Sequence, residues 1–360
     1  MWVGHRLCAP AAVLMVLPPW AAAQPPPRPD VSGVPVSGFI YAAAPFASAH
    51  ASTIEETADG LVAAWFGGTA EGDPDVGIWS SRLDGTRWSI PVEVATGAQP
   101  DGTRHPTWNP VLFRPTDGPL LLFYKVGPSP REWWGLVRTS SDDGRSWSAE
   151  ILLPDGVLGP IRAKPVELRP GTLLAGSSTE HNGWVVRMER LTTSERTLAG
   201  WQRALASPGS WDHVGPLNDP GEFAAIQPTI LVHSDQDLQI LCRSRQRLIT
   251  QAWSHDGGLT WGPMSATDLP NPSAGIDALR LANGRFVLVY NPTTRGRRHL
   301  AIAVSDDGVT WRSGVTLEQA DEGEFSYPAM IQTSDGLVHV TYTWRRQRVK
   351  HVVLDPARLE

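Results

Sequence analysis

The residues of this 360-residue chain best suited to binding an anion are basic side chains. They are Arg162, Lys164, Arg243, Arg245 and Arg298, the last of which follows another arginine, Arg297. A guanidinium group is planar and donates two parallel hydrogen bonds to a carboxylate, so it fixes both the charge and the orientation of a ligand. On a chain with a formal net charge of −6, such a cluster indicates an acidic ligand. The alternative is that single cations pair with Asp277, Glu324 or Asp73 and only stabilise the fold.

Tyr327 and Asp73 have side chains that could break a bond by nucleophilic attack with acid assistance. A tyrosine phenol becomes a nucleophile only when a neighbouring group removes its proton, and Glu322 and Glu324 are candidates for that role. Asp73 and Asp75 follow a glycine-containing loop, and two adjacent carboxylates favour the protonated acid when both face one site. The alternatives are a tyrosine that only stacks on a ligand and an acidic loop that only contacts solvent.

His50 offers a second chemistry. Imidazole titrates near neutral pH, so His50 could be the base and Tyr327 the acid of a β-elimination beside a carboxylate. Arg243 would then stabilise the negative charge that develops on that carboxylate. His105 is another candidate base, and a lone histidine with a purely structural role is the alternative for both.

These residues must be positioned by turns and strands, and one turn motif recurs three times. Ser254–Trp261 reads Ser-x-Asp-x-Gly-x-Thr-Trp, Ser140–Trp147 repeats it with serine for threonine, and Val304–Trp311 repeats it with the first serine lost. In this Asp-box the aspartate can accept bonds from backbone N–H groups of its own turn, the glycine takes a positive φ, and the tryptophan packs over the hairpin. The three aspartates are therefore predicted to be structural.

Six further turns each precede a short apolar strand. They are Asp59-Gly60, Asp117-Gly118, Pro170-Gly171, Gln236-Asp237, Asn283-Gly284 and Asp335-Gly336. A spacing near 50 residues is typical of four-stranded propeller blades. The sequence therefore predicts an all-β fold, a six-bladed β-propeller with four-stranded antiparallel blades. We expect Gly38 to Ala42 to close the ring as an outer strand of the last blade, and Trp88 and Trp201 to close the hairpins of two degenerate boxes.

The innermost strand of each propeller blade runs along the central channel, so the starts of these strands should open onto one funnel. Such a start lies about ten residues before each turn. The polar side chains expected to converge there are His50, Asn109, Arg162 or Lys164, Gln227, Asp277 and Tyr327. Trp108 and Trp133-Trp134 could stack on a sugar ring or pack in the core.

The ends and composition of the chain indicate where it works. Residues 1–23 read as a signal peptide, 24–36 as a disordered proline-rich leader, and 37–360 as one domain, so we expect a secreted or periplasmic protein without a membrane span after cleavage. Loss of Arg6 leaves 30 Lys and Arg against 37 Asp and Glu, which disfavours nucleic acid as a partner. Cys242 alone cannot form an internal disulfide. No motif predicts a cofactor or metal, and a monomer is expected.

In these repeats the chain resembles the sialidase (neuraminidase) superfamily of six-bladed Asp-box propellers. Local similarities include Ile54–Gly67, Asn109–Leu112, Leu300–Trp311 and the Ser326-Tyr327 segment. The resemblance implies that Tyr327 is the nucleophile, that Asp73 is the acid/base, and that Arg243 with Arg297 or Arg298 binds a carboxylate. The family's first arginine signature is replaced by His50-Ala51-Ser52, and Gln227 stands in place of the glutamate that assists the tyrosine.

Three functions follow as hypotheses from these observations. The first is a sialidase-like exo-glycosidase that removes an acidic terminal sugar from a glycan. The second is a polysaccharide lyase that uses His50 and Tyr327 to cleave a uronate-containing glycan. The third is a propeller that binds glycans without cleaving them, since two family positions have changed.

Overall fold

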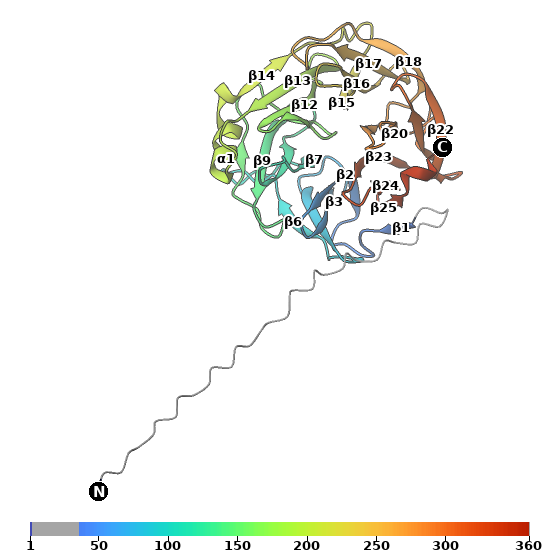
Figure 1. Cartoon of the computed structure of the whole chain (residues 1–360). Helices are drawn as coiled ribbons and strands as arrows, with labels where there is room; N and C mark the ends of the chain where they lie inside the picture. The colour runs from blue at the N-terminus through green and yellow to red at the C-terminus, as the bar shows by residue number, and fades with distance from the viewer. Residues whose placement is uncertain (2–35, 360) are drawn as a thin grey trace.

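The computed structural model describes Met1 and residues 36–359, and its strands form six antiparallel sheets arranged in a ring around a central channel (Figure 1). Five sheets have four strands, and the sheet of blade 1 has a fifth because β6 also pairs with β4. The predicted six-bladed propeller is therefore confirmed. The expected signal peptide, and the leader up to residue 35, lie outside the described residues.

Blades 1 to 3 occupy the first part of the ring. Blade 1 contains β2 (Ser48–Thr57), β3 (Gly60–Gly68), β4 (Gly77–Asp84), β5 (Arg87–Trp88) and β6 (Val92–Ala95). Blade 2 contains β7 (Thr107–Phe113), β8 (Leu120–Val126), β9 (Trp134–Ser140) and β10 (Ile151–Leu152). Blade 3 contains β11 (Val166–Arg169), β12 (Thr172–Thr179), β13 (Val185–Thr192) and β14 (Trp211–Val214).

Blades 4 to 6 complete the ring. Blade 4 contains β15 (Ala225–Val232), β16 (Leu238–Ser244), β17 (Leu248–Ser254) and β18 (Ser265–Pro270). Blade 5 contains β19 (Asp277–Arg280), β20 (Phe286–Tyr290), β21 (His299–Ser305) and β22 (Trp311–Gln319). Blade 6 contains β23 (Phe325–Gln332), β24 (Val338–Trp344), β25 (Arg348–Leu354) and, on its outside, β1 (Val36–Phe39).

The chain ends close the ring within blade 6. Strand β1 pairs antiparallel with β25, with Val36 opposite Val353 and Phe39 opposite Lys350. The closing strand thus begins two residues before the expected Gly38. Because the pairing joins the first described strand to the last one, opening the ring requires breaking this ladder.

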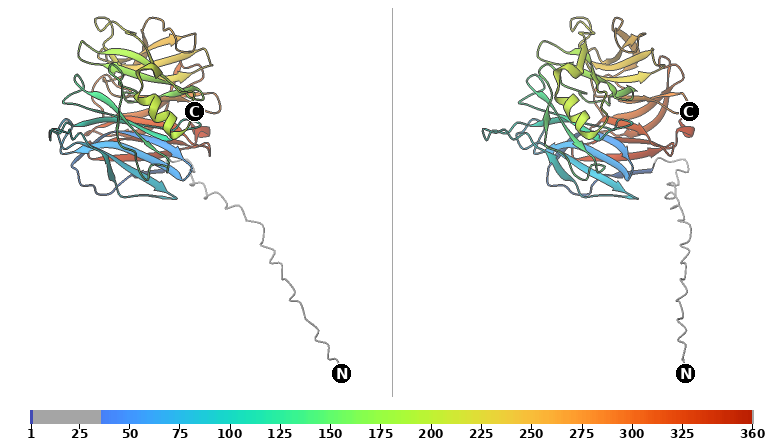
Figure 2. Two further views of the ribbon diagram at one scale, coloured as in Figure 1. Left: turned by 90° about the vertical axis from the view of Figure 1, so that its left-hand side faces the viewer. Right: turned by 60° about the vertical axis from the view of Figure 1, so that its left-hand side comes forward.

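The second strand of each blade is almost wholly buried because it is covered on both faces. All seven residues of β8 are buried, as are all five of β20. Neighbouring blades share apolar clusters, one of which joins Val62 of β3 to Leu122 of β8. The side views show the ring of blades from its edge (Figure 2). Removal of these apolar faces from water is the main stabilising contribution in such a sheet stack.

The Asp-boxes form the predicted turns, with one change in register. Asp256 accepts hydrogen bonds from Thr260 N (2.9 Å) and Ser254 Oγ (2.8 Å), and Gly258 N donates to Ser254 Oγ. In the third box Ser305 and Asp307 make the equivalent contacts. Its first serine is therefore not lost, because the box is one residue shorter between the aspartate and the glycine.

The expectation for Trp201 was wrong, since this residue lies in the short helix α1 (Leu198–Ala206) on the outside of blade 3. Thr197 caps the helix by accepting a hydrogen bond from Gly200 N. Trp201, Ala204 and Leu205 recur at helical spacing and are buried. The Trp201 indole donates to the Asp117 carbonyl, so the helix covers the gap between blades 2 and 3 instead of closing a box hairpin. Two single-turn 3-10 helices span Pro208–Ser210 and Pro356–Arg358.

Four inner strands share a bulge that bends them at the channel. Ala51, Asn109, Gln227 and Tyr327 all have a left-handed backbone, with φ between 41° and 57°. The ladder skips at the same place in β2, β7, β15 and β23. Such a bulge re-aims a side chain relative to the regular alternation of a strand. Non-glycine residues rarely adopt this conformation, and their concentration beside the channel points to a functional site.

Candidate functional site

Tyr327 lies at the centre of a cluster of basic residues in the channel. The guanidinium carbons of Arg162, Arg243 and Arg297 lie 5.5, 5.4 and 5.6 Å from its ring centroid. Tyr327 is 8% exposed, and no described residue hydrogen-bonds to its phenol oxygen. Blades 3, 4 and 5 thus each direct one cation to this tyrosine from blade 6, which makes the funnel attractive to an anion.

Arg162 crosses the channel and forms its floor. Its Nη1 donates to the Pro328 carbonyl (2.8 Å) and its Nη2 to the Ile276 carbonyl (2.7 Å). The guanidinium is fully buried, and burial lowers its pKa while the charge of Asp277 opposes this effect. A Cβ atom on Gly275 would lie 3.1 Å from Arg162 Nε and 3.2 Å from Tyr327 Cγ, so a larger residue there would have to displace one of these side chains slightly.

Asp277 supports this floor and is not open to the funnel. Its carboxylate accepts hydrogen bonds from Thr229 Oγ1 (3.0 Å) and Met330 N (2.8 Å). Burial raises the pKa of Asp277, and the Arg162 charge opposes the rise. The Arg162 and Asp277 side chains therefore connect blades 3, 4, 5 and 6 at the axis.

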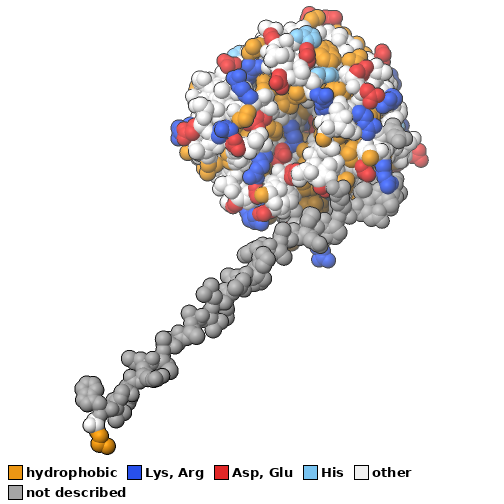
Figure 3. Space-filling view, in the orientation of Figure 1, with side chains coloured by type: hydrophobic (Ala, Val, Ile, Leu, Met, Phe, Trp, Pro, Cys, Tyr) orange, Lys and Arg blue, Asp and Glu red, His pale blue; other side chains and the backbone are white. Residues whose placement is uncertain are grey.

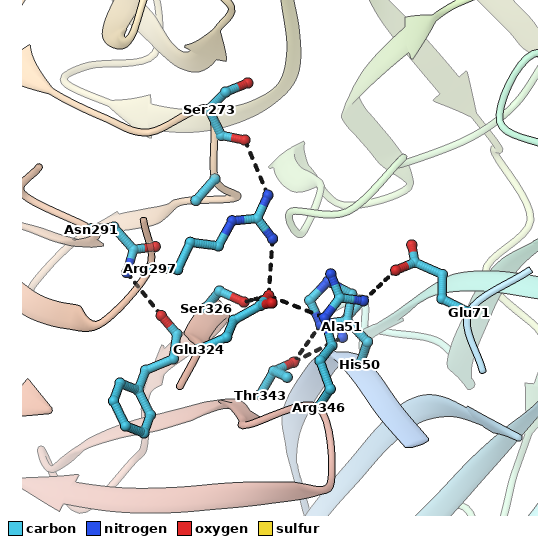
Figure 4. Close-up of polar contacts among 12 residues, drawn as sticks. His50, Ala51, Glu71, Ser273, Asn291, Arg297, Glu324, Ser326, Thr343 and Arg346 are labelled. Atoms are coloured by element: carbon cyan, nitrogen blue, oxygen red, sulfur yellow. Dashed lines mark hydrogen bonds and ion pairs between the residues drawn. The ribbon is translucent and has the colours of Figure 1, made fainter. Parts of the chain in front are cut away.

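One carboxylate oxygen of Glu324 accepts hydrogen bonds from two arginines (Figure 4). Its Oε1 accepts hydrogen bonds from Arg297 Nη1 (2.9 Å), Arg346 Nε (3.1 Å) and Ser326 Oγ (2.6 Å). Burial favours the neutral acid, but Arg346, Ser326 and Arg297 together lower the pKa of Glu324 below its usual value. Glu324 therefore remains a carboxylate that orients two cations and is a poor base for Tyr327.

Arg346 is the main residue that sequence reasoning missed. It follows β24 in a tight turn in which Arg345 and Arg346 have φ of 53° and 59°, and Gln347 N donates to the Trp344 carbonyl. Such a turn favours Asn-Gly, so two arginines in it indicate strain at a functional site. Ala49 N donates to the Arg346 carbonyl (2.8 Å), which fixes the turn beside β2. The Arg345-Arg346 pair after a predicted strand was the available signal.

His50 is buried beside Tyr327, with their ring centroids 4.1 Å apart. Its Nδ1 lies 2.8 Å from Thr343 Oγ1, while the buried Nε2 has no hydrogen-bond partner. Burial, followed by the charge of Arg346 and of the other three arginines, lowers the pKa of His50 well below its usual value. His50 is only 1% exposed, so it contacts Tyr327 and has almost no surface to offer a ligand.

Trp184 extends the site toward blade 3 and was also missed. Arg243 and Arg245 place their guanidinium carbons 4.9 and 4.4 Å from the Trp184 ring centroid. The indole donates to Glu180 Oε2 (2.9 Å). Burial raises the pKa of Glu180, and the charges of Arg243, Arg245 and Arg131 oppose the rise.

The loop that carries Asp73 borders the funnel. Glu71 in this loop forms an ion pair with Arg346, as Figure 4 shows. A Cβ atom on Gly72 would lie 3.7 Å from Trp108. Asp75 accepts hydrogen bonds from Thr69 N and Oγ1 and so stabilises the loop. No described residue hydrogen-bonds or pairs with the half-buried Asp73 carboxylate.

Several expected residues lie away from the Tyr327 cluster. Lys164 binds Glu55 Oε2 (2.8 Å) and the Leu112 carbonyl, so it links blades. Arg298 donates to the Asp321 carbonyl (2.5 Å), and Arg297 is the arginine of this pair that reaches Tyr327. The Trp108 indole donates to the Gly127 carbonyl and its ring packs between Phe66 and Trp133, so it is not an open platform.

Asn109 and Gln227 occupy the bulges of blades 2 and 4 and are buried. The Gln227 Oε1 atom has no hydrogen-bond partner, whereas its backbone N–H donates to Ser178 Oγ. His105 packs against Trp134 and makes no contact with Tyr327. The catalytic roles expected of Gln227 and His105, and the substrate-binding role expected of Asn109, stay predictions.

Figure 3 shows the molecule hollowed at the channel mouth, with basic and acidic side chains on the wall of the hollow. Within residues 36–359, no group of three His, Cys, Asp or Glu side chains is arranged to bind a metal ion. The described helices are too short or too polar to cross a bilayer. The site can thus present positive charge and one phenol to a ligand.

Comparisons with known proteins agree with this architecture. The structure of a protein of unknown function from Dyadobacter fermentans is 18% identical with a TM-score of 0.69, covering 89% of this chain and 97% of that one. Hadza microbial sialidase Hz136 is 16% identical with a TM-score of 0.70, covering 87% of this chain and 66% of that one.

A Penicillium chrysogenum alpha-L-arabinanase complexed with arabinobiose is 15% identical with a TM-score of 0.60, covering 87% of this chain and 95% of that one. No curated protein sequence matches the chain. The sequence pattern of the BNR repeat-like domain matches residues 59–340. The chain therefore belongs to the BNR repeat-like domain family, as a divergent member with the propeller fold of sialidases and arabinanase.

Proposed function

We propose that the protein is a secreted, sialidase-like exo-glycosidase that removes an acidic terminal sugar from a glycan. The observation that carries the proposal is the convergence of Arg162, Arg243 and Arg297 around Tyr327, whose phenol oxygen has no hydrogen-bond partner among the described residues. Arg346 lies beside this cluster, because Glu324 binds both Arg297 and Arg346. A planar carboxylate is the ligand group that such guanidinium groups bind best. Arg346, from a turn beside His50, supplies the cation that the altered first arginine signature lacks.

The residues present support a retaining hydrolysis. The carboxylate of the sugar would bind Arg243, Arg297 and Arg346, which holds the anomeric carbon against Tyr327. Solvent base removes the phenol proton through water in the funnel and the phenol oxygen attacks the anomeric carbon, while protonated Asp73 gives its proton to the oxygen of the departing sugar as the glycosidic bond breaks. Water then displaces Tyr327 from the glycosyl-tyrosine. The Asp73 carboxylate takes one proton of that water, and the released Tyr327 phenolate takes a proton back from solvent.

A lyase remains the second candidate because the His50 ring packs against Tyr327 and its buried Nε2 atom has no hydrogen-bond partner. Elimination needs a base that reaches a sugar proton, and the 1% exposure of His50 argues against this role. The hydrolase is therefore the function that the geometry supports best.

Activity assays on glycans capped with sialic acid or with a uronic acid test the proposal. We expect release of the free acidic sugar without an ultraviolet-absorbing unsaturated product. Tyr327→Phe should abolish release, and an activated fluorinated acidic sugar should add its mass to the native chain but not to this variant. Ultraviolet absorbance without free acid would favour the lyase, and binding without turnover would leave a glycan-binding propeller.

A further inference from the structure

A groove of about 550 Å³ lies between blades 2 and 3, outside the arginine cluster. Its walls come from the start of β9, from the loop after β10 and from the loop between β12 and β13. The residues that give it chemical character are Arg131, Trp133, Trp134, Asp155, Glu180 and Arg187. This volume is within the range of about 300–1,000 Å³ that is usual for small-molecule sites.

Both walls of the groove adjoin the funnel. On the blade 2 side, the Trp133 ring packs on Trp108 with a centroid distance of 6.1 Å, and Trp108 borders Gly72 in the Asp73 loop. On the blade 3 side, Glu180 accepts a hydrogen bond from the Trp184 indole N–H, and the Arg243 guanidinium lies over the Trp184 ring. A ligand held in the funnel can therefore continue into the groove without leaving the protein surface.

The chemistry of the groove differs from that of the funnel. Two tryptophans offer flat apolar surface, and the two arginines are balanced by the carboxylates of Asp155 and Glu180. Aromatic faces suit the C–H faces of sugar rings, while charged groups with both donors and acceptors suit hydroxyl groups. A balanced set of charges favours uncharged sugar units over a second acidic one.

We propose that this groove binds the uncharged sugars to which the acidic terminal sugar is attached, on the leaving-group side of the cleaved bond. The inference rests on the proposed function and refines its substrate class. The substrate is then an oligosaccharide of at least three units with one acidic cap, and a simple glycoside of the acid is a poor substrate.

Titration calorimetry on the Tyr327→Phe variant separates binding from turnover. The ligands are sialic acid, glucuronic acid, each acid capping lactose, and lactose alone. We expect one of the capped trisaccharides to bind at least tenfold more tightly than its free acid. Arg131→Ala and Trp133→Ala should each remove most of this gain, because they delete a polar and an aromatic contact of the groove. Arg87→Ala, which changes an exposed arginine of blade 1, should keep it.

The outcomes distinguish the groove from the funnel. Free acid that binds as well as the trisaccharide, or a gain that survives both groove variants, overturns the groove proposal and leaves the funnel assignment standing. If no ligand of the series binds, both assignments fall. Thermal unfolding of each variant shows whether Trp133→Ala has altered the fold, and the exposed Arg131 provides the test if it has.

Discussion

Lowering the pH from 7.5 to 5.5 should destabilise the folded protein through two buried histidines. Burial and four arginines lower the pKa of His50. Burial, and then the neighbouring His339, lowers the pKa of His351 to about 3. His351 lies in blade 6 with its Nε2 atom 2.9 Å from His339 Nδ1. Both His50 and His351 therefore stay neutral in the folded protein at pH 5.5.

Between pH 7.5 and 5.5, these two histidines bind protons in the unfolded chain but not in the folded protein. A histidine in an unfolded chain titrates near pH 6.5, so stability falls below that pH by about 1.4 kcal/mol per pH unit for each such residue. Two residues over one pH unit give a loss of about 3 kcal/mol at pH 5.5. Burial raises the pKa values of Glu180, Glu189 and Asp277 and lowers the pKa of Lys125 to about 7. These groups therefore take up protons in the folded state over this pH range and oppose part of the loss.

Variants isolate the histidine contribution from that of the carboxyls. Urea denaturation followed by tryptophan fluorescence gives the free energy of unfolding at each pH for the native chain, His50→Gln, His351→Gln and the exposed-site control His213→Gln. Each buried variant should reduce the difference between the two pH values by about 1.4 kcal/mol, and the control should not. A constant loss of stability in a variant cancels in this difference. Equal differences in all four proteins would refute the assignment of neutral buried histidines.

Three further changes test the site and the scaffold. Arg346→Lys should raise KM for the acid-capped trisaccharide at least tenfold, because lysine cannot replace a guanidinium that contacts Glu71 and Glu324; an unchanged KM in steady-state assays would remove Arg346 from the clamp. Asp277→Asn should lower the free energy of unfolding by about 3–5 kcal/mol in urea denaturation, because Arg162 stays buried without its counter-charge; a loss below about 1 kcal/mol would contradict this account. Asp256→Ala should lower Tm by a few degrees in a thermal melt and leave turnover intact, because its carboxylate binds only its own turn, and lost turnover would assign it a wider role.

The fold could be read from the sequence because each blade repeats its own signals. Turn residues, apolar strands and Asp-boxes are local features, so six hairpins and the closing strand were predictable. Trp201 was misassigned because spacing alone suggested a box hairpin, whereas the Thr197 cap and the apolar face of Trp201, Ala204 and Leu205 favour a helix. The local helix signals, and not the spacing of the Asp-boxes, therefore determine the structure of the segment around Trp201.

The candidate site could be read only in part. Tyr327, Arg162 and His50 come from the starts of inner strands, and propeller geometry brings such starts together. Arg243 lies near the end of β16 and was predicted from the resemblance to sialidases. The direction of a side chain in a loop depends on contacts that no spacing reports. Arg297 and Arg298 differ by one position, yet Glu324 binds the first and the Asp321 carbonyl binds the second. Arg346 owes its place to a turn held by blade 1, a neighbour that is distant in the sequence.

The bulge that recurs at Ala51, Asn109, Gln227 and Tyr327 sets these four side chains apart from the hydrogen-bonded ladders that hold the blades together. These four positions sit on equivalent bends of different blades, so exchanging their side chains need not disturb the hydrogen-bonded ladders outside them. A small library that varies three of them around a fixed Tyr327 would therefore test which of these side chains select the sugar, in a ring whose ladders stay the same.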